Sequence, residues 1–206
     1  MLRVGLTGGV ACGKSTVGQM LASRGAHFLQ ADTLAHRLYT PGEATYYAVV
    51  ECFGREILNG DGTINRTRLA NAAFPDRIGE LNAIVHPAVI AAQNRWMEEM
   101  EGAGPHGIAV VEAALIIEAG AAKDFNKLIV VTCDLEQKVA RYAQRGKISL
   151  EEARTEVLRR SAAQLSDEEK ARRADFVIDN SGMLENTTEQ VNQVWSELQN
   201  IARRPR

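Results

Sequence analysis

The sequence predicts an α/β fold in which helices flank a five-stranded parallel sheet. Short apolar segments alternate with stretches of helical periodicity, which is the pattern of parallel strand–helix units. The apolar segments are nearly continuous, as expected for strands that are buried on both faces of a sheet. A glycine-rich turn follows the first of them and leads into a helical stretch. The predicted strands are residues 2–7, 27–29, 108–112, 128–132 and 176–179.

The glycine-rich turn has the spacing G-x-x-x-x-G-K-S, in the letters GGVACGKS from Gly8 to Ser15. In such a loop the backbone N–H groups surround phosphates, the lysine reaches the β- and γ-phosphates, and the hydroxyl is a ligand of Mg²⁺. The helix that follows aims its N-terminus at the anion. The sequence therefore predicts a nucleoside triphosphate site on a P-loop NTPase-type fold. Its expected phosphate-binding residues are Gly8, Gly9, Ala11, Cys12, Gly13, Lys14, Ser15 and Thr16.

The composition is that of an ordinary globular protein. The chain has 206 residues, which predicts a single domain over 1–206, with 45% hydrophobic and 24% charged residues. The formal net charge of −2 argues against a general nucleic-acid or membrane binder. No apolar run has membrane-spanning length, and the start shows no signal-peptide pattern. Because its three cysteines are widely separated and odd in number, we expect reduced thiols and a cytoplasmic protein. We also expect a monomer or weak homo-oligomer.

The region of about 40–103 contains no convincing strand and is predicted to be a helical insertion. The letters TPGE, from Thr40 to Glu43, resemble a capping box with proline at the first helical position, so a helix is expected to begin there and end at Phe53. Residues 59–63 predict a turn, and residues 66–74 and 78–84 predict short helices. His86 and Pro87 are expected to open a separate, longer helix. In a kinase, such an insertion is where the acceptor substrate usually binds.

A second helical region follows the fourth predicted strand. Ser149 with Glu152, and Ser166 with Glu169, form capping boxes that begin consecutive helices. Basic residues are dense over 141–173, with acidic residues between them. This pattern fits a solvated helix surface with i,i+4 ion pairs. It equally fits a lid, over about 141–165, whose arginines close over a triphosphate. Residues 184–201 predict an amphipathic helix packed on the sheet.

Asp32 comes directly after the second predicted strand. If that strand neighbours the first, Asp32 lies near the phosphate loop, where a carboxylate can accept the proton of an attacking hydroxyl. Asp32 could also cap the following helix. The sequence shows no Asn-Lys-x-Asp guanine motif, which disfavours a GTPase, and its size disfavours a motor ATPase. A nucleotide-binding regulator without activity would lack this carboxylate.

Further blocks have the order of one kinase family. ADTLAHRL, LNAIVHP and ADFVIDNSG follow the phosphate loop in turn. Along nearly its whole length the chain resembles the dephospho-CoA kinases. The resemblance implies Mg²⁺- and ATP-dependent phosphorylation of the ribose 3′-hydroxyl of dephospho-CoA, the last step of coenzyme A synthesis. Another P-loop small-molecule kinase, of the nucleoside, nucleotide or shikimate type, is the alternative.

The resemblance also assigns residues. It implies Ser15 as the Mg²⁺ ligand and Asp32 as the base. Lys14, Arg141 and Arg145 are implied in catalysis, and Asn180 lies where the adenine loop is expected. Arg160 and Gln164 belong to the lid and its hinge. The resemblance implies that the acceptor is bound by Thr7, Asp32, His86 and Glu118.

Three positions depart from expectation. The family usually has aspartate at the end of the third strand, where this chain has Glu112, and the role of Glu112 is left open. The first aspartate of the family's Asp-Ala-Asp block is Gln30, so only Asp32 can carry the base role. Cys12 lies in the phosphate loop beside Lys14 and a helix N-terminus, and it could simply be the small side chain that this position requires. Because that environment lowers a thiol pKa, our hypothesis is that Cys12 is the most reactive of the three cysteines.

Overall fold

The computed structural model describes residues 1–104 and 107–204. The chain divides into two compact units. The first comprises Met1–Gln30 and Met100–Arg206, and the second comprises Ala31–Glu99. The predicted insertion falls largely within the second unit. Among the described residues, no helix combines the length and the apolar character needed to cross a membrane.

The first unit is built on the predicted five-stranded parallel sheet. Its strands are β1 (Leu2–Gly8), β2 (His27–Gln30), β3 (Ile108–Glu112), β4 (Lys127–Thr132) and β5 (Phe176–Asp179), each within one residue of its predicted bounds. The spatial order is β2-β3-β1-β4-β5, and all neighbours are parallel. The placement of Asp32 near the phosphate loop was conditional on the second strand lying beside the first. That condition is not met, because β3 lies between β1 and β2. Sequence patterns identify strands but carry little information on their lateral order.

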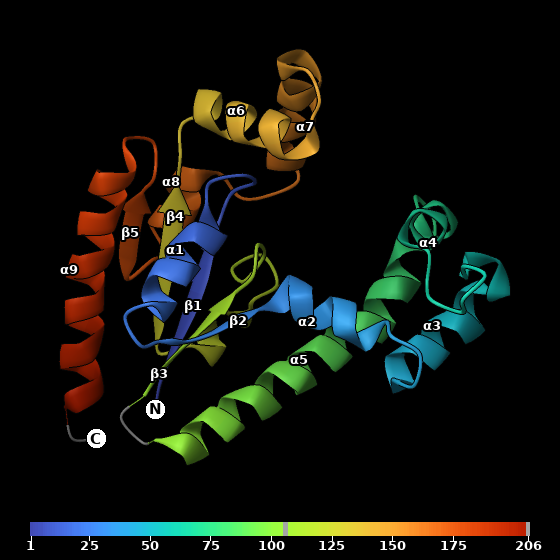
Figure 1. Cartoon of the computed structure of the whole chain (residues 1–206), viewed down its shortest axis with the longest axis horizontal. Coiled ribbons are helices and arrows are strands. Elements are labelled where there is room, and N and C mark those ends of the chain that lie inside the picture. The colour runs from blue at the N-terminus through green and yellow to red at the C-terminus, as the bar shows by residue number, and fades with distance from the viewer. Residues whose placement is uncertain (105–106, 205–206) are drawn as a thin grey trace. The chain divides into compact units, whose positions relative to one another are not determined.

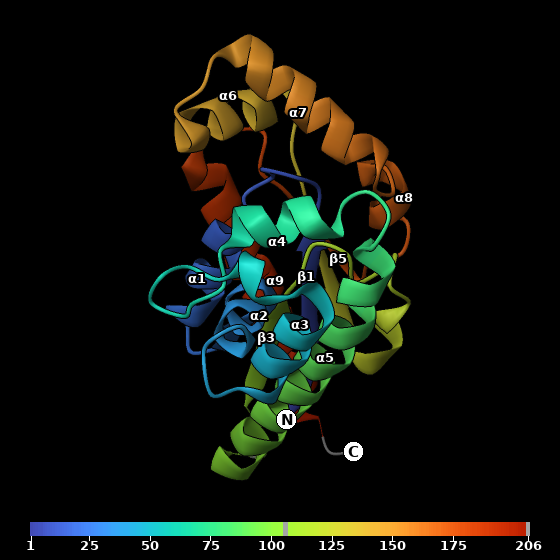
Figure 2. The ribbon, with the colours of Figure 1, turned by 90° about the vertical axis from the view of Figure 1, so that its right-hand side faces the viewer.

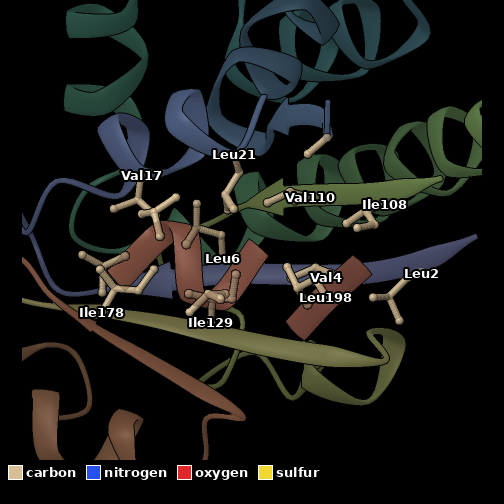
Figure 3. Packing of buried hydrophobic residues seen from close by; sticks show 14 of the residues in the cluster. Leu2, Val4, Leu6, Val17, Leu21, Ile108, Val110, Ile129, Ile178 and Leu198 are labelled. Atoms are coloured by element: carbon tan, nitrogen blue, oxygen red, sulfur yellow. The ribbon is translucent and has the colours of Figure 1, made fainter. Parts of the chain in front are cut away.

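One face of the sheet packs against two helices, α1 (Lys14–Ala22) and α9 (Leu184–Arg203), as Figure 1 shows. Alternate strand residues point to this face, where they meet apolar side chains of both helices (Figure 3). The predicted amphipathic helix at 184–201 is thus confirmed. The core residues labelled in Figure 3 are Leu2, Val4, Leu6, Val17, Leu21, Ile108, Val110, Ile129, Ile178 and Leu198.

The opposite face is covered by shorter segments. Leu128 and Val130 of β4 point to this side, where they pack with Ile116 and Ile117 of the segment after β3. That segment continues into a 3₁₀ helix, η2 (Ala121–Asp124). The helix α8 (Asp167–Ala171) also contacts β4.

After β4, two helices form an antiparallel pair, α6 (Leu135–Gly146) and α7 (Leu150–Ala162), which can be followed in Figure 2. Both predicted capping boxes are present, at the starts of α7 and α8. Val139 of α6 and Val157 of α7 belong to an apolar cluster that also contains Val10 of the glycine-rich loop. The pair is therefore packed directly on that loop.

The second unit is helical. It contains α2 (Ala31–Leu38), α3 (Ala44–Phe53), a 3₁₀ helix η1 (Arg55–Ile57), α4 (Arg66–Ala73) and most of α5 (Ile78–Ala103). The predicted turn at 59–63 is confirmed by a hydrogen bond from the N–H of Gly62 to the carbonyl of Asn59 (3.0 Å). The core of this unit consists of Val49, Phe53, Ile57, Leu69, Ala73 and Val85.

The predicted start of α3 at the Thr40–Glu43 capping box is wrong. The helix begins at Ala44, and Glu43 is its N-cap residue. Gly42 has φ +104°, and the N–H of Glu43 donates to the carbonyl of Thr40 (3.2 Å). The Pro-Gly pair therefore forms a β-turn before the helix, because a glycine at positive φ favours a turn over a first helical turn.

The predicted break at His86 and Pro87 is also wrong. Pro87 lies inside the single helix α5. A proline lacks an N–H, so the helix loses the bond to the carbonyl of Ala83 at a cost of about 3 kcal/mol. Val85 and Val89, on either side of the proline, are packed in the apolar core of the second unit. We attribute the continuity of the helix to this packing, which outweighs the local penalty.

Candidate active site

The glycine-rich loop connects β1 to α1, as predicted. Gly8 has φ +150° and Gly13 has φ +92°, values that glycine adopts at little cost. A Cβ on Gly8 would collide with the carbonyl oxygen of Val131, and a Cβ on Gly13 would collide with the amide of Asn180. Ala11 is also left-handed, with φ 55°, which is strained for a residue with a Cβ. The loop is thus a tight turn that leads into the N-terminus of α1.

The side chain of Lys14 folds over the first half of this loop. Its Nζ donates hydrogen bonds to the carbonyl oxygens of Gly8 (3.1 Å) and Gly9 (2.8 Å). In a phosphate-binding loop this lysine contacts the β- and γ-phosphates, whereas the helix end holds the phosphates nearer the nucleoside. The position of Lys14 therefore marks Gly8 and Gly9 as the γ-phosphate end of the loop.

The Ser15 hydroxyl, at the start of α1, is bonded to a buried carboxylate. Its Oγ donates to Oε1 of Glu112 (2.9 Å), and Nε2 of Gln30 donates to Oε2 of the same group (2.9 Å). Glu112 is only 9% exposed, and the register of β2 with β3 places it opposite Gln30. Both oxygens of Glu112 are therefore held, one by the phosphate loop and one by the neighbouring strand.

These residues fit a magnesium ion that arrives with a nucleotide. Mg²⁺ takes hard oxygen ligands, keeps several waters, and is usually held by one or two protein groups together with phosphates. The hydroxyl of Ser15 and the carboxylate of Glu112 provide such oxygens side by side. Within residues 1–104 and 107–204, no cluster of three or more His, Cys, Asp or Glu side chains could hold a metal by itself.

Arg141 and Asn180 brace the loop at its other end. The Nη2 of Arg141 donates to the backbone carbonyl of Asn180 (3.0 Å), and its Nη1 lies 3.4 Å from the carbonyl of Cys12. The Asn180 amide donates to that same carbonyl (2.8 Å) and accepts from the hydroxyl of Thr187 (2.9 Å). Asn180 is 3% exposed. Arg141 is thus fixed on the loop, and the Asn180 side chain supports the loop as a structural strut.

Arg145 and Arg160 have a different environment. Both are exposed, and each guanidinium lies over the ring of Tyr142, at 5.4 Å and 5.5 Å from its centroid. Arg160 also pairs with Glu156 (2.6 Å). The two arginines come from different helices, α6 and α7, and meet at one aromatic ring.

The expectation that Cys12 is the most reactive thiol is not supported by its environment. Cys12 has no exposed surface. Burial raises the pKa of its thiol, and the nearby charge of Lys14 only partly opposes this effect. A helix N-terminus and a lysine favour the thiolate, but here the loss of solvation is larger. Cys133 is also buried, and Cys52 is the most accessible of the three.

Glu118 and Thr7, which the resemblance placed on the acceptor side, have protein partners. The ammonium of Lys170, which has no exposed surface, lies 2.9 Å from Oε1 of Glu118 and donates to the carbonyl of Ala114 (3.2 Å). The buried hydroxyl of Thr7 donates to the same carbonyl (3.1 Å). The backbone N–H of Leu165 also donates to Glu118 (3.1 Å). Contacts of Glu118 and Thr7 with an acceptor remain predictions.

Comparison with known proteins decides the family. The chain matches the family model described as dephospho-CoA kinase over residues 2–186. The chain belongs to the dephospho-CoA kinase family. It is 38% identical over 200 residues to the dephospho-CoA kinase of Syntrophus aciditrophicus, covering 96% of this chain and 83% of that protein. It is 40% identical over 208 residues to that of Geobacter metallireducens, with full coverage of both.

Solved structures agree with this assignment. TT1252 from Thermus thermophilus is similar with a TM-score of 0.76 and 33% identity, covering 96% of this chain and 97% of that one. Dephospho-CoA kinase from Campylobacter jejuni gives a TM-score of 0.69 at 26% identity, with the same coverage. A shikimate kinase from Bacteroides thetaiotaomicron, at 11% identity and a TM-score of 0.50, shares the fold.

In this member of the dephospho-CoA kinase family, two predicted site residues lie in the second unit. Asp32 is exposed in the first turn of α2, inside the helix and not at its cap. Its negative charge there suits the positive end of the helix dipole. His86 is exposed on α5. Their roles as base and acceptor contact remain predictions, whereas the loop, Glu112, Arg141 and Asn180 are assembled within the first unit.

Sequence reasoning missed two lysines of this kinase. Lys138 and Lys170 are 8% and 0% exposed, and each pairs with a carboxylate. Lys170 lies in the basic region of 141–173 and Lys138 lies just before it, where alternating charges resemble an ordinary solvated helix surface. Helical spacing could have identified Lys138 as a site residue. It lies three residues before Arg141, which places both side chains on the same face of α6.

Proposed function

We propose that this chain transfers the γ-phosphoryl group of ATP to the ribose 3′-hydroxyl of dephospho-CoA, giving coenzyme A and ADP. Dephospho-CoA is proposed as the acceptor because the chain belongs to the dephospho-CoA kinase family. The phosphate loop, with Ser15 bonded to Glu112, supports the choice of donor. The reaction forms a bond from the ribose oxygen to the γ-phosphorus as the bond to the β–γ bridging oxygen breaks.

In this proposal the loop N–H groups and Lys14 hold the triphosphate. The N–H hydrogens and the Lys14 ammonium would face phosphate oxygens, on which negative charge is redistributed during phosphoryl transfer. Ser15 and Glu112 would hold Mg²⁺, Ser15 directly and Glu112 by orienting Ser15 or a bound water. Held by these residues, Mg²⁺ would supply positive charge that offsets the charge of the phosphate oxygens. Asn180 contributes to ATP binding by supporting the loop at Cys12.

Asp32 is proposed to accept the proton of the 3′-hydroxyl as that oxygen attacks. Thr7, His86 and Glu118 are proposed on the acceptor side. Of these, His86 lies in the helical insertion of about 40–103, whereas Thr7 and Glu118 belong to the first unit. Arg141 and Arg145 are proposed to stabilise the transferring group, with α6 and α7 as the lid of about 141–165. The whole chain then acts as one kinase, with ATP and dephospho-CoA as its substrates.

The test is ATP consumption with dephospho-CoA beside a panel of nucleosides, nucleotides and shikimate. We expect turnover with dephospho-CoA to exceed that with any other acceptor, and phosphorus NMR of the product to show a 3′-phosphate. Preferred turnover of shikimate or of a nucleoside would establish the alternative kinase class instead.

A further inference from the structure

A second lysine reaches the γ-phosphate end of the loop. Lys138 lies on α6, and a Cβ built on Gly9 would be 3.2 Å from its Nζ. Gly9 is also a partner of Lys14, whose Nζ is 2.8 Å from its carbonyl oxygen. Two ammonium groups therefore converge on the residue that marks the γ-phosphate end.

Lys138 and Arg141 together span the loop from one helix face. They are three residues apart on α6, so their side chains lie side by side. Arg141 contacts the carbonyl of Cys12, near the helix end of the loop, while Lys138 lies at Gly9, near its beginning. A triphosphate laid along the loop would meet a cation from α6 at each end.

Lys138 is paired with a carboxylate that also lies against the loop. Its Nζ is 2.6 Å from Oδ2 of Asp167, and Oδ1 of Asp167 would be 2.8 Å from a Cβ on Gly9. The side chains of Lys138 and Asp167 are 10% and 21% exposed. A carboxylate in this place repels a γ-phosphate and competes with it for the lysine, and partial burial strengthens both effects.

The surroundings give the pair room to separate. A pocket of about 510 Å³ is bounded by Gly9, Lys138 and Asp167, and by Ser161 and Gln164 from the end of α7 and the segment after it. Asp167 is the first residue of α8, whereas Lys138 is in the first turn of α6. The two charges thus come from separate elements.

We propose that Lys138 binds the γ-phosphate of ATP by exchanging its partner, Asp167, for a phosphate oxygen. Lys138 thereby distinguishes a nucleoside triphosphate from a diphosphate, and Asp167 weakens triphosphate binding by the competing ion pair. This inference rests on the proposed use of ATP.

The test is calorimetric binding of Mg²⁺ complexes of ATP and ADP to the full chain. Lys138→Gln removes a charge-assisted contact, so we expect ATP affinity to fall about 10- to 100-fold and ADP affinity to change less than about 3-fold. Asp167→Asn frees the lysine, so ATP affinity should rise while ADP affinity stays the same. Lys127→Gln is the matched control, because it breaks a lysine–aspartate pair of the same length outside α6 and α7, with Asp175 (2.6 Å), and should change neither.

The double variant separates a direct contact from an indirect one. In the Asp167→Asn background, Lys138→Gln must still reduce ATP affinity selectively, because the lysine itself meets the phosphate. No effect in that background, or an equal loss of ATP and ADP in Lys138→Gln, would overturn the inference. Circular dichroism of each variant identifies loss of folding. Failure of the unmodified chain to bind ATP would instead refute the proposed function.

Discussion

The Ser15 hydroxyl at the start of α1 donates a 2.9 Å hydrogen bond to Glu112 at the end of β3. Gln30 donates to the second oxygen of the same carboxylate. A glutamate is longer than the aspartate usual in the family and has one more rotatable bond. The hydrogen bonds from Ser15 and Gln30 hold the Glu112 side chain in one conformation. Gln30 and Glu112, which both differ from the residues expected of the family, therefore contact each other directly.

Glu112→Gln should weaken metal binding at the nucleotide site. Removing an outer partner of a metal ligand commonly costs about 10- to 100-fold in affinity, and we expect a loss in that range. Gln30→Ala should produce a smaller loss in the same direction, because Glu112 keeps its bond to Ser15. Binding of Mn²⁺ with a non-hydrolysable ATP analogue, followed by electron paramagnetic resonance, measures both. Gln19→Ala, an exposed change on α1, is the control, and unchanged Mn²⁺ affinity in Glu112→Gln would remove that residue from the metal site.

Asp32→Asn should retain ATP binding and lose turnover. A positioned base is worth about 10²- to 10⁴-fold, and the low end is expected because loose phosphoryl transfer needs little proton removal. Asp76→Asn, another exposed aspartate of the second unit, serves as the matched control. Steady-state kinetics with dephospho-CoA and ATP calorimetry test the two parts separately. Turnover of Asp32→Asn close to that of the control would exclude Asp32 as the base.

Lys170→Ala should destabilise the fold by about 3 kcal/mol, the lower end for breaking a buried ion pair, since Glu118 keeps some exposure. Partial burial by itself raises the pKa of Glu118, but hydrogen bonds from Lys170 and from backbone N–H groups lower it below its ordinary value. A lowered pKa contributes stability above the unfolded-state pKa, which is lost as the pH falls through the folded-state pKa.

Urea unfolding at several pH values measures this contribution. Lys170→Met with Glu118→Gln should recover part of the loss, because neither unpaired charge is left. It should also lose the acid dependence that belongs to Glu118. A Lys170→Ala variant as stable as the parent chain would show that the pair contributes nothing.

Cys52 should react with an alkylating agent before Cys12 or Cys133. It is the most accessible thiol, whereas the other two are buried. Burial is the first cause of the raised pKa of all three thiols, so alkylation should be slow at neutral pH and accelerate as the pH rises. Peptide-resolved mass spectrometry gives the order of reaction, with Cys52→Ser as the control. Faster labelling of Cys12 would mean that the loop opens readily in solution.

The strands and the phosphate loop were predictable because their signals are local. Buried strands are continuous apolar runs, and the loop has a fixed spacing of glycine, lysine and serine. The lateral order of strands is not local, so a place for β2 beside β1 could only be stated as a condition, and β3 lies between them. Glu112 could be recognised as a strand-end carboxylate, but its bond to Ser15 depends on that order. The same limit explains Cys12, since its local neighbours favour a thiolate whereas burial by distant segments determines its pKa.

The close approach of Gly13 and Asn180 means that a substitution at one of these positions constrains which residues the other can accept. The Asn180 amide fills the space that any side chain at position 13 would need. A lineage that replaced this glycine would first have to shorten the asparagine, and would then lose the strut at Cys12. The architecture around Gly13 therefore requires a glycine there, and we expect relatives that had abandoned phosphoryl transfer to retain it as well.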